Sequence, residues 1–451
     1  MISHPCLNIP EMLAEIFSHC IENNEPASLS SAPLVLGYVC HLWRNVTYTT
    51  PGLWRTLSVT INRGKPRPSI AGARQWMGRS GVLPLSLSLY QTEECETSNI
   101  VAGQFLKLFT QYHTRWLNIH FELPTWDSLQ SVQVDGLSRP SSLRSFELLC
   151  SQPQSQTVCP ELTSMLFLVG MAPQLSGLKV LFDAGSFVEA RFIPTTLTHL
   201  RLQDVADVSL CLNIIARCSR LVSCTLELDH AWQSHVDAGW DMVVLSRTLR
   251  YLEIHTRPFQ FRPLFSHLTL PALQELAIFV DYHDFDQEVL MNFLTRSCCC
   301  LLSLTLYDTG ISGGNLIKLC QHTSVKGLTR LSLMQNYRED WEQSPTVTQT
   351  VVEALTPSEE EESALLYALE ALYFEGWLLS CTSSALVRMV ESRWRVCKGK
   401  VAQLRSLALK TRPSDLDEAY EKLEQLEKEG FELQLNESEW ILQEDTLAWR
   451  Y

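Results

Sequence analysis

From about residue 143 onward, apolar residues recur at positions i, i+3 and i+5, and this recurrence limits the possible folds more than any other feature. Successive copies from Leu197 to Leu328 begin 24, 28, 24, 28 and 27 residues apart. A short strand followed by a helix fits that period, and one such unit cannot bury its own apolar face. Neighbouring units must therefore stack into a continuous core. The copies are Leu143-Phe146-Leu148, Leu162-Met165-Phe167, Leu175-Leu178-Val180, Leu197-Leu200-Leu202, Leu221-Cys224-Leu226, Leu249-Leu252-Ile254, Leu273-Leu276-Ile278, Leu301-Leu304-Leu306, Leu328-Leu331-Leu333, Leu369-Leu372-Phe374 and Leu404-Leu407-Leu409.

The period and spacing of these copies resemble those of leucine-rich repeats. The resemblance implies an α/β solenoid built from a parallel sheet and helices. Amphipathic periodicity between the copies predicts short helices over 210–217, 288–296, 315–321 and 384–395. Three residues after the last apolar position, where the family has asparagine or cysteine, only Asn336 matches cleanly. We therefore expect irregular coils of uneven curvature; a β-helix or an ordinary α/β domain is the alternative.

Three further segments flank or interrupt the repeat. Alternating apolar residues over 83–89 and 117–123 predict strands that extend the sheet toward the N-terminus. Residues 337–367, with two prolines and a run of four glutamates, predict an acidic surface loop. Residues 413–451 predict an acidic amphipathic helix that ends near Gly430 and covers the last repeat. Ser414 or Asp415 is expected to cap it, and its apolar face consists of Leu416, Tyr420, Leu423 and Leu426.

Residues 7–54 follow a different, helical pattern. Pro10 suits the first turn of a helix, where its missing N–H has no partner to lose. Pro26 and Pro33 mark a break before a second apolar stripe, and Pro51-Gly52 ends it. A unit of under ~60 residues buries little core of its own. It must cover its apolar surface with the rest of the chain, a partner or both. The two apolar stripes are Leu13, Ile16, Phe17, Cys20 and Ile21, then Leu36, Val39, Leu42, Trp43 and Val46.

The order and spacing of several elements in this stretch resemble an F-box, in the extended form of F-box-like proteins of mushroom-forming fungi. Plain core residues of a helical domain are the alternative interpretation of the same positions. The predicted organisation is an F-box-like helical module over 1–60, an irregular leucine-rich-repeat region over 61–412, and the acidic C-terminal helix over 413–451. The elements that carry the resemblance are Ile9-Pro10-Glu11, Ile16-Phe17, Val39-Cys40, Trp43-Arg44, Pro51 and Leu53-Trp54.

An F-box implies docking onto a Skp-type linker protein and, through it, onto the cullin of a ubiquitin ligase. Buried apolar and aromatic anchors dominate such interfaces, so the exposed members of the motif should form the linker-binding surface. The candidate residues are Ile9, Pro10, Ile16, Phe17, Leu36, Val39, Cys40, Trp43, Leu53 and Trp54.

The repeats predict a second surface, for an unidentified target protein. Strand residues alternate between the core and the concave face of a solenoid, so the residues between the leucines are candidates for target binding. Their mixture of charged, aromatic and hydroxyl groups suits a protein better than a polyanion. Solvated strand residues are the alternative. The candidates are His199, Arg201, Thr225, Glu227, Tyr251, Glu253, Glu275, Ser303, Thr305 and Arg330.

Composition narrows the classes of partner and compartment. The chain is 45% hydrophobic and 19% charged, as in folded proteins. A net charge of −14, with twelve carboxylates and two lysines over 415–445, disfavours nucleic acid as the ligand. No run of 18 apolar residues and no basic leader occur, so neither membrane nor secretion is expected. The fifteen cysteines form no C-x-x-C pair and lie mostly in apolar segments, which favours a soluble protein of the cytosol or nucleus.

No motif for catalysis, metal or cofactor binding stands out. The glycines over 310–314 suit a plain turn, and the acidic run over 281–286 suits a helix cap. His230 and His235 share no helical face, and Cys298-Cys299-Cys300 cannot all aim at one metal ion. We therefore expect no catalytic residue, no metal, no cofactor and no enzymatic activity. The sequence favours a substrate-recognition adaptor of a cullin-based ubiquitin ligase; the alternative is a non-enzymatic repeat scaffold for protein–protein interaction that is independent of ubiquitin transfer.

Overall fold

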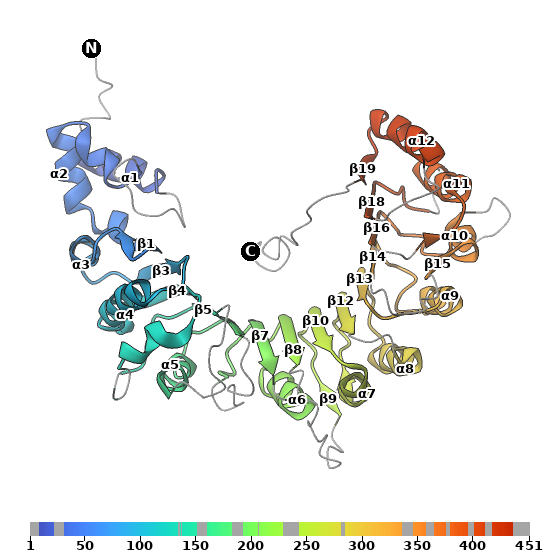
Figure 1. The fold of residues 1–451 in the computed structure, drawn as a ribbon, viewed down its shortest axis with the longest axis horizontal. Coiled ribbons are helices and arrows are strands. Elements are labelled where there is room, and N and C mark those ends of the chain that lie inside the picture. Colours follow the sequence, from blue (N-terminus) through green and yellow to red (C-terminus); the bar gives the residue numbers. More distant parts are fainter. Residues whose placement is uncertain are drawn as a thin grey trace. The chain divides into compact units, whose positions relative to one another are not determined.

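A computed structural model describes residues 9–21, 31–133, 136, 138–150, 160–182, 193–205, 207–228, 243–280, 285–335, 346–357, 365–375, 379–395, 401–410 and 417–435. They belong to two compact units, Met1–Ala206 and Asp207–Tyr451. The predicted divisions at residues 60 and 412 stay predictions. In each unit, parallel strands form one layer and helices pack along the other (Figure 1). The prediction of an α/β fold with a long, mostly parallel sheet is therefore confirmed, and its stacked units are solenoid-like.

The first unit begins with helices and continues with alternating strands and helices. Its sheet has the order β7-β6-β5-β4-β3-β1-β2, parallel except for the antiparallel β1–β2 hairpin. The elements are α1 (Pro10–Ser18), η2 (Val35–Tyr38), α2 (His41–Thr49), η3 (Pro51–Trp54), β1 (Thr56–Asn62), β2 (Lys65–Arg67), α3 (Ile70–Arg79), β3 (Leu85–Gln91), α4 (Glu96–Thr110), η4 (His113–Arg115), β4 (Trp116–Leu123), η5 (Trp126–Ser131), β5 (Ser145–Cys150), α5 (Pro160–Gly170), β6 (Gly177–Phe182) and β7 (His199–Val205).

The second unit repeats strand and helix with few exceptions. Its main sheet has the order β19-β18-β16-β14-β13-β12-β10-β8, and two short parallel pairs, β9–β11 and β15–β17, lie apart from it. The elements are α6 (Val208–Arg217), β8 (Ser223–Leu228), β9 (Val244–Leu245), β10 (Tyr251–Thr256), α7 (Pro258–His267), β11 (Leu268–Thr269), β12 (Glu275–Val280), α8 (Gln287–Ser297), β13 (Ser303–Tyr307), α9 (Gly313–Gln321), β14 (Arg330–Met334), β15 (Val347–Thr348), α10 (Gln349–Leu355), β16 (Ala371–Glu375), β17 (Leu379–Ser380), α11 (Ser383–Trp394), β18 (Ser406–Lys410), α12 (Asp417–Lys428) and β19 (Glu432–Leu435).

Backbone hydrogen bonds start six strands of the second unit, β10, β12, β13, β14, β16 and β18, in the same way. The carbonyl of Val222 accepts the N–H groups of Arg250 and Tyr251, and the carbonyl of Arg250 accepts those of Gln274 and Glu275. The same double acceptance continues at Gln274, Leu302, Thr329 and Glu370. Because each coil repeats this contact, the apolar positions of successive strands stay in register. The aligned, buried residues include Leu252, Leu276, Leu304, Leu331, Leu372 and Leu407.

Side-chain caps fix where the helices begin. Asp286, inside the acidic run predicted to cap a helix, accepts the N–H of Val289 at 3.2 Å. Ser312, inside the glycine-containing turn, caps α9 in the same way. All four predicted helices over 210–217, 288–296, 315–321 and 384–395 are confirmed as parts of α6, α8, α9 and α11. The predicted strands over 83–89 and 117–123 are confirmed as β3 and β4, with shifted ends.

One predicted repeat strand is wrong. Leu162-Met165-Phe167 lies in helix α5, where Leu162, Met165, Leu166 and Val169 are buried and Phe167 is exposed. Burial at intervals of three and four residues is the helical period, and Pro160 at the start suits the first helical turn. A match at three apolar positions does not by itself distinguish a repeat strand from a helix.

Two other expectations are corrected: the loop over 337–367 and the terminal helix. In both places the structure contains more strand–helix elements than the sequence predicted. The segment predicted as a loop over 337–367 contains β15 and helix α10, although 336–345 and 358–364 lie outside the described residues. Helix α12 is confirmed and ends before Gly430, whose φ is +100°. It does not close the fold as a terminal cover, because β19 follows it and pairs in parallel with β18. The proposed cap residues Ser414 and Asp415 lie outside the described residues.

None of the helices within the described ranges has the length and apolar content needed to cross a bilayer.

Candidate protein-binding surfaces

The helical module at the start of the first unit has a small core of its own. Leu13 and Phe17 of α1 are fully buried, and the Phe17 ring lies 4.9 Å from the Trp43 ring of α2. Leu53 and Trp54 are also buried, and the indole N–H of Trp54 donates to the Thr47 carbonyl at 2.8 Å. These contacts join α1, α2 and η3 into one packed piece.

An aromatic cluster attaches this module to the first strand–helix pair. Trp54 lies edge-on to Trp76 of α3, with 4.8 Å between ring centres. The guanidinium of Arg79 lies over the rings of Tyr48 and Trp54, at 4.2 and 4.5 Å from their centres. Cation–π contacts of this kind stabilise by about 0.5–2 kcal/mol each, depending on burial. The module therefore has a defined position on α3.

The module also exposes large apolar side chains. Ile9, Met12 and Ile16 share one face of α1 and are 46%, 44% and 40% exposed. Tyr38 and Val39, at the end of η2, are 63% and 58% exposed. We call these five residues the apolar face of the module. Isolated exposed apolar residues are ordinary on a protein surface, whereas an exposed apolar group can serve as an interaction surface.

The ten candidate linker-binding residues divide into surface and core. Ile9, Pro10, Ile16, Val39 and Cys40 are exposed, and Trp43 is half-buried. Four candidates have almost no accessible surface, because they fill the core of the module, and they are removed from the candidate surface: Phe17, Leu36, Leu53 and Trp54.

Cys40 also has a local structural role. It is the N-cap of α2, where its sulfur accepts the N–H of Trp43 at 3.4 Å. The predicted second helix is thereby broken into η2 and α2. Met12 and Tyr38 were missed as surface candidates, although the helical spacing of Met12 from Ile9 and Ile16 was visible in the sequence.

The ten candidate target-binding residues belong to both units. His199 and Arg201 are on β7 of the first unit, and the other eight are on β8, β10, β12, β13 and β14 of the second. Thr225 is buried, Arg330 is exposed, and the remaining candidates are half-buried. Glu275 and Arg330 form an ion pair at 3.3 Å. The eight residues of the second unit lie on the strand layer, on the opposite side from the aligned leucines.

The last outward positions of six neighbouring strands in the second unit form a row that the sequence prediction largely missed. The register aligns, in order across β8, β10, β12, β13, β14 and β16, the residues Glu227, His255, Phe279, Tyr307, Met334 and Glu375. We call this set the ring row. His255 stacks on Phe279 at 4.0 Å, and Phe279 lies 5.1 Å from Tyr307. The residues beside these rings are short: Ala277, Thr305 and Ser332.

Glutamates flank the rings and the thioether, and the register continues past Glu375 to Lys410 of β18. At one end, Glu253 accepts hydrogen bonds from the Tyr251 hydroxyl and pairs with His255 Nε2 at 2.8 Å. At the other end, Glu375 accepts a hydrogen bond from the Tyr373 hydroxyl. Glu227 and Glu253 were among the sequence candidates, whereas His255, Phe279, Tyr307 and Glu375 were not, because the repeat motif ends one residue before the ring-row position.

The strand layer of the first unit has a more polar row. The register aligns His120 of β4 with Glu147 of β5, and Glu147 with Lys179 of β6. His120 Nδ1 lies 2.9 Å from Glu147, and its Nε2 lies 3.8 Å from Glu122. Burial disfavours the charged imidazolium, but the two carboxylates outweigh that cost and raise the pKa of His120 to about 9. His120 therefore carries a positive charge at neutral pH.

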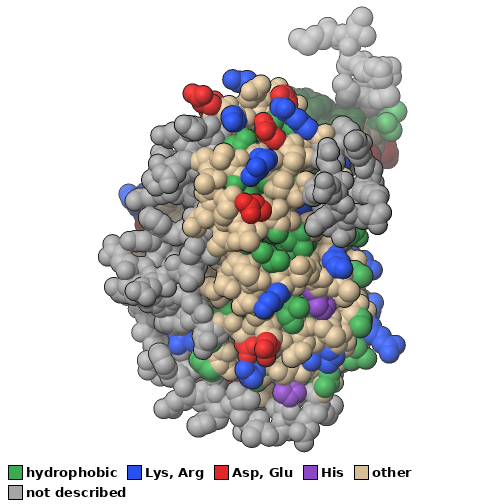
Figure 2. Space-filling view, turned by 90° about the vertical axis from the view of Figure 1, so that its right-hand side faces the viewer, with side chains coloured by type: hydrophobic (Ala, Val, Ile, Leu, Met, Phe, Trp, Pro, Cys, Tyr) green, Lys and Arg blue, Asp and Glu red, His purple; other side chains and the backbone are tan. Residues whose placement is uncertain are grey.

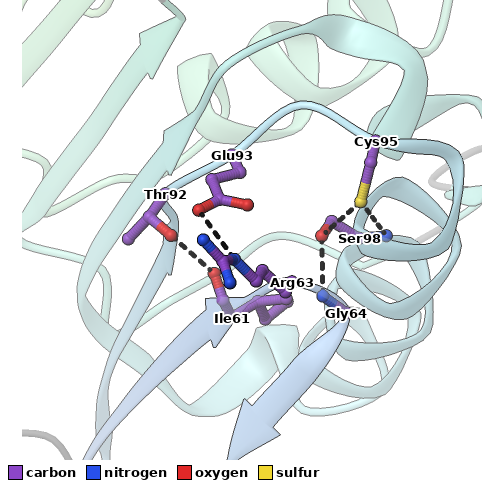
Figure 3. Close-up of polar contacts among 7 residues, drawn as sticks. All are labelled: Ile61, Arg63, Gly64, Thr92, Glu93, Cys95 and Ser98. Atoms are coloured by element: carbon purple, nitrogen blue, oxygen red, sulfur yellow. Dashed lines mark hydrogen bonds and ion pairs between the residues drawn. The ribbon is translucent and has the colours of Figure 1, made fainter.

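The loops that follow β1 and β3 are joined by the polar contacts in Figure 3. Thr92 donates to the Ile61 carbonyl at 3.2 Å, and Gly64 N–H donates to Ser98 Oγ at 2.9 Å. Cys95 is the N-cap of α4, and its thiol lies 3.0 Å from Ser98 Oγ. That hydrogen bond lowers the pKa of Cys95 below its ordinary value.

The helix layer of the second unit carries mixed charges. In Figure 2, which faces this layer, Lys and Arg side chains alternate with Asp and Glu, and hydrophobic side chains appear in small groups. This distribution is typical of a solvated surface.

The chain matches no protein-family model, and a search of curated proteins found no match.

Proposed function

We propose that this chain is the substrate-recognition adaptor of a cullin-based ubiquitin ligase, with its N-terminal helical module docking a Skp-type linker and its repeats holding a target protein. The proposal unites the F-box resemblance of residues 9–54 with the apolar face of the module. A surface of exposed Ile, Met, Tyr and Val is stabilised when a partner removes it from water.

The observation that carries this proposal is the separation of core and surface within one small module. Leu13 and Phe17 bury one face of α1 in the core of the module. Ile9, Met12 and Ile16 are exposed on another face of the same helix. Anchoring by Arg79, Trp54 and Trp76 gives that face a fixed support. A preorganised apolar surface loses little entropy on binding, which favours affinity.

The adaptor itself performs no chemistry in this proposal. It raises the local concentration of target lysines near a charged ubiquitin-conjugating enzyme. Ubiquitin transfer to the target should therefore require the linker and the cullin in the reaction. Transfer by the isolated chain, abolished by replacing one cysteine, contradicts the proposal and reveals a thioester enzyme.

Linker binding is tested with the double variant Ile16→Glu and Val39→Glu in the full chain. Both side chains are exposed, so the fold should survive while binding to a purified Skp-type linker weakens by about 2–4 kcal/mol, as for the loss of two interface anchors. The matched control is Val82→Glu, since Val82 is an apolar residue that is 90% exposed in the turn before β3.

The outcomes separate the adaptor from the scaffold. Stoichiometric co-purification of linker and cullin with the chain, lost in the double variant and kept in the control, supports the adaptor. A folded double variant that binds the linker as tightly as the unmodified chain refutes the assigned surface. If the unmodified chain binds no linker, the alternative of a repeat scaffold independent of ubiquitin transfer takes its place.

A further inference from the structure

The stretch between Glu25 and Glu93 is basic in an otherwise acidic chain. It contains seven lysines and arginines and no aspartate or glutamate, whereas the whole chain has a net charge of −14. Arg44, Arg55 and Arg79 make contacts inside the first unit, with backbone carbonyls or aromatic rings. The remaining four cations are all exposed, and they are Arg63, Lys65, Arg67 and Arg74.

Three of these exposed cations lie on the β1–β2 hairpin, at the edge of the sheet. Arg63 is in the two-residue turn, and Lys65 and Arg67 are on β2, aligned with Asn62 and Thr60 of β1. Partners directly across two strands share one face of a sheet, and the apolar residues of β1 are buried on the other face. The two β2 cations therefore lie on the outward face of the strand layer. We call Arg63, Lys65 and Arg67 the cationic hairpin.

The tip of the cationic hairpin is held against the start of α4, as Figure 3 shows. The Gly64 N–H donates to Ser98 Oγ at 2.9 Å, and Arg63 Nε lies 3.6 Å from Glu93 Oε1. A Cβ added at Gly64 would lie 2.6 Å from Thr97 Cγ2, so the two segments approach closely. The backbone that carries the cations is therefore fixed before any partner binds, and little entropy is lost on binding.

The choice of residue in the turn adds a charge at a conformational cost. Arg63 has a φ of +49° and Gly64 a φ of +68°, a pair of values for which asparagine or aspartate is preferred at the first position. The Arg63 side chain is 82% exposed, and its ion pair with Glu93 is exposed as well, so water screens it strongly. A strained residue that keeps an exposed charge is a reason to look for a ligand at the tip.

The spacing of the two strand cations indicates the shape of their partner. Lys65 and Arg67 form no ion pair within the described ranges. Two residues apart on a strand, their Cα atoms are separated by about 6.6 Å, and alternate side chains of any extended segment have the same separation. Carboxylates at alternate positions of an extended partner therefore match both cations. The arginine guanidinium also accommodates a carboxylate with two parallel hydrogen bonds.

The backbone of β2 limits how such a segment binds. Pro66 lies between the two cations and has no N–H, so a further strand cannot extend the sheet here with a regular hydrogen-bond ladder. Side-chain charges must then supply the binding, which makes it sensitive to salt. A short edge strand with lysine and proline also prevents pairing with another sheet. Edge protection alone predicts no ligand, and the two roles are separated below.

We propose that the cationic hairpin binds an extended acidic segment of a partner protein, with carboxylates at alternate positions. A short segment responds mainly to charges within a Debye length, about 8 Å at physiological ionic strength. A long polyanion such as a nucleic acid also meets the negative charge of the rest of the chain. The cationic hairpin shares no residue with the apolar face of the module, and this inference does not rest on the proposed function.

Four labelled ligands test the chemistry of the partner on the full chain. The first is the peptide Ser-Glu-Ser-Glu-Ser-Glu-Ser, the second and third have glutamine and lysine in place of glutamate, and the fourth is an oligothymidylate of eight nucleotides. Acetylated and amidated peptide ends remove the terminal charges. With an uncharged dye, fluorescence anisotropy should show the first binding about tenfold more tightly than the second and more tightly than the oligonucleotide. Added sodium chloride should weaken the first peptide.

Three variants locate the binding. Lys65→Gln with Arg67→Gln should weaken the first peptide about tenfold. Lys318→Gln with Arg388→Gln removes the same net charge from exposed positions of α9 and α11 and should leave its binding unchanged. Arg63→Asn should weaken it about threefold without lowering the midpoint of thermal unfolding, because asparagine suits the turn.

Several results overturn the inference. They are equal binding of the glutamate and glutamine peptides, no binding of the first peptide at millimolar concentration, tighter binding of the oligonucleotide, and equal losses in the two double variants. If the Lys65→Gln and Arg67→Gln variant self-associates in sedimentation but binds the first peptide as before, the hairpin is an edge protection only. A chain that selects the first peptide but binds no Skp-type linker keeps the cationic hairpin and loses the adaptor role.

Discussion

His120 shows how one alternating position in a strand acquires a fixed charge. Its neighbour in the register is Glu147, and the imidazole lies between that carboxylate and Glu122, with the Tyr90 ring 5.0 Å away. A histidine whose pKa rises on folding binds its proton more tightly in the folded state. The resulting stabilisation is complete below the ordinary pKa of 6.5 and is lost as the pH rises through about 9.

We therefore predict a pH dependence of stability that belongs to the first unit. Between pH 6.5 and 9 the free energy of unfolding should fall by on the order of 1 kcal/mol, after allowance for solvent screening of the partly exposed pair. Chemical denaturation at a series of pH values measures it. His120→Gln should flatten this part of the profile. An unchanged slope in that variant contradicts the assignment.

Arg393 is a second residue whose charge is structural. It is fully buried in α11 and donates to the carbonyls of Leu355, Leu366 and Leu365 at 2.7, 3.1 and 2.6 Å. Burial lowers its pKa to about 10, so the guanidinium remains charged at neutral pH. Arg296 of α8 has the same role, with bonds to the carbonyls of Phe265 and Leu268. Each arginine satisfies carbonyls of the preceding coil.

Replacing Arg393 by Met should destabilise the second unit by about 2–4 kcal/mol, because buried carbonyls lose a charged donor. The matched control is Arg395→Met two residues away, whose exposed ion pair with Glu429 at 3.3 Å should contribute little. Thermal unfolding of both variants makes the comparison. Equal losses in the two variants contradict the structural role of Arg393.

At the scale of elements, α1 and α5 show that an apolar stripe does not by itself reveal its partner. Both begin with proline and both bury one face. In α5 the buried face packs within the strand–helix repeat, whereas α1 buries Leu13 and Phe17 and leaves a second apolar face exposed. The position of α1 depends on the aromatic cluster around Trp54, which joins the module to α3.

Arg79→Ala should loosen the module without unfolding the rest of the first unit. Loss of two cation–π contacts is expected to cost about 1–2 kcal/mol, and hydrogen exchange in α1 and α2 should accelerate accordingly. Arg74→Ala on the exposed side of the same helix is the control and should change neither. Acceleration of exchange confined to α3, with α1 and α2 unaffected, argues against a role of Arg79 in fixing the module on α3.

At the scale of the whole molecule, the repeated backbone contact makes each coil depend mainly on its neighbours. The carbonyl of Glu370 accepts the N–H groups of Arg405 and Ser406 at the start of β18. The carbonyl of Arg405 accepts the N–H of Glu432 at the start of β19. On the helix layer, α12 continues the stack, with Trp394 and Phe431 rings 5.4 Å apart. Stability in such arrays is close to a sum of local and nearest-neighbour contributions.

A cavity at one end should therefore have a local effect. Leu426→Ala, at a fully buried position of α12, should cost about 2–4 kcal/mol. Its increase in hydrogen exchange should be concentrated in α11, β18 and β19 and leave β1 to β5 unchanged. Glu424→Ala on the exposed side of α12 is the control. A uniform increase across both units contradicts nearest-neighbour stability.

Several features follow from the sequence alone because they depend on local periodicity. Leucines at i, i+3 and i+5 with a period of 24 to 28 residues demand stacked strand–helix units, since no single unit buries its apolar side. The acidic run that ends at Asp286 was predicted at a helix start because a carboxylate there accepts a free backbone N–H group. The helical character of residues 9–54 also follows from spacing.

Only the tertiary structure decides which apolar residues are covered and which distant strands become neighbours. Phe17 and Ile16 are adjacent in sequence and equally apolar, yet one is in the core and the other on the surface, because α2 and η3 pack on one side of α1. The ring row depends on the register of six strands spread over 149 residues, from Glu227 to Glu375. Periodicity determines what each segment must bury; packing between segments determines where the remaining side chains meet.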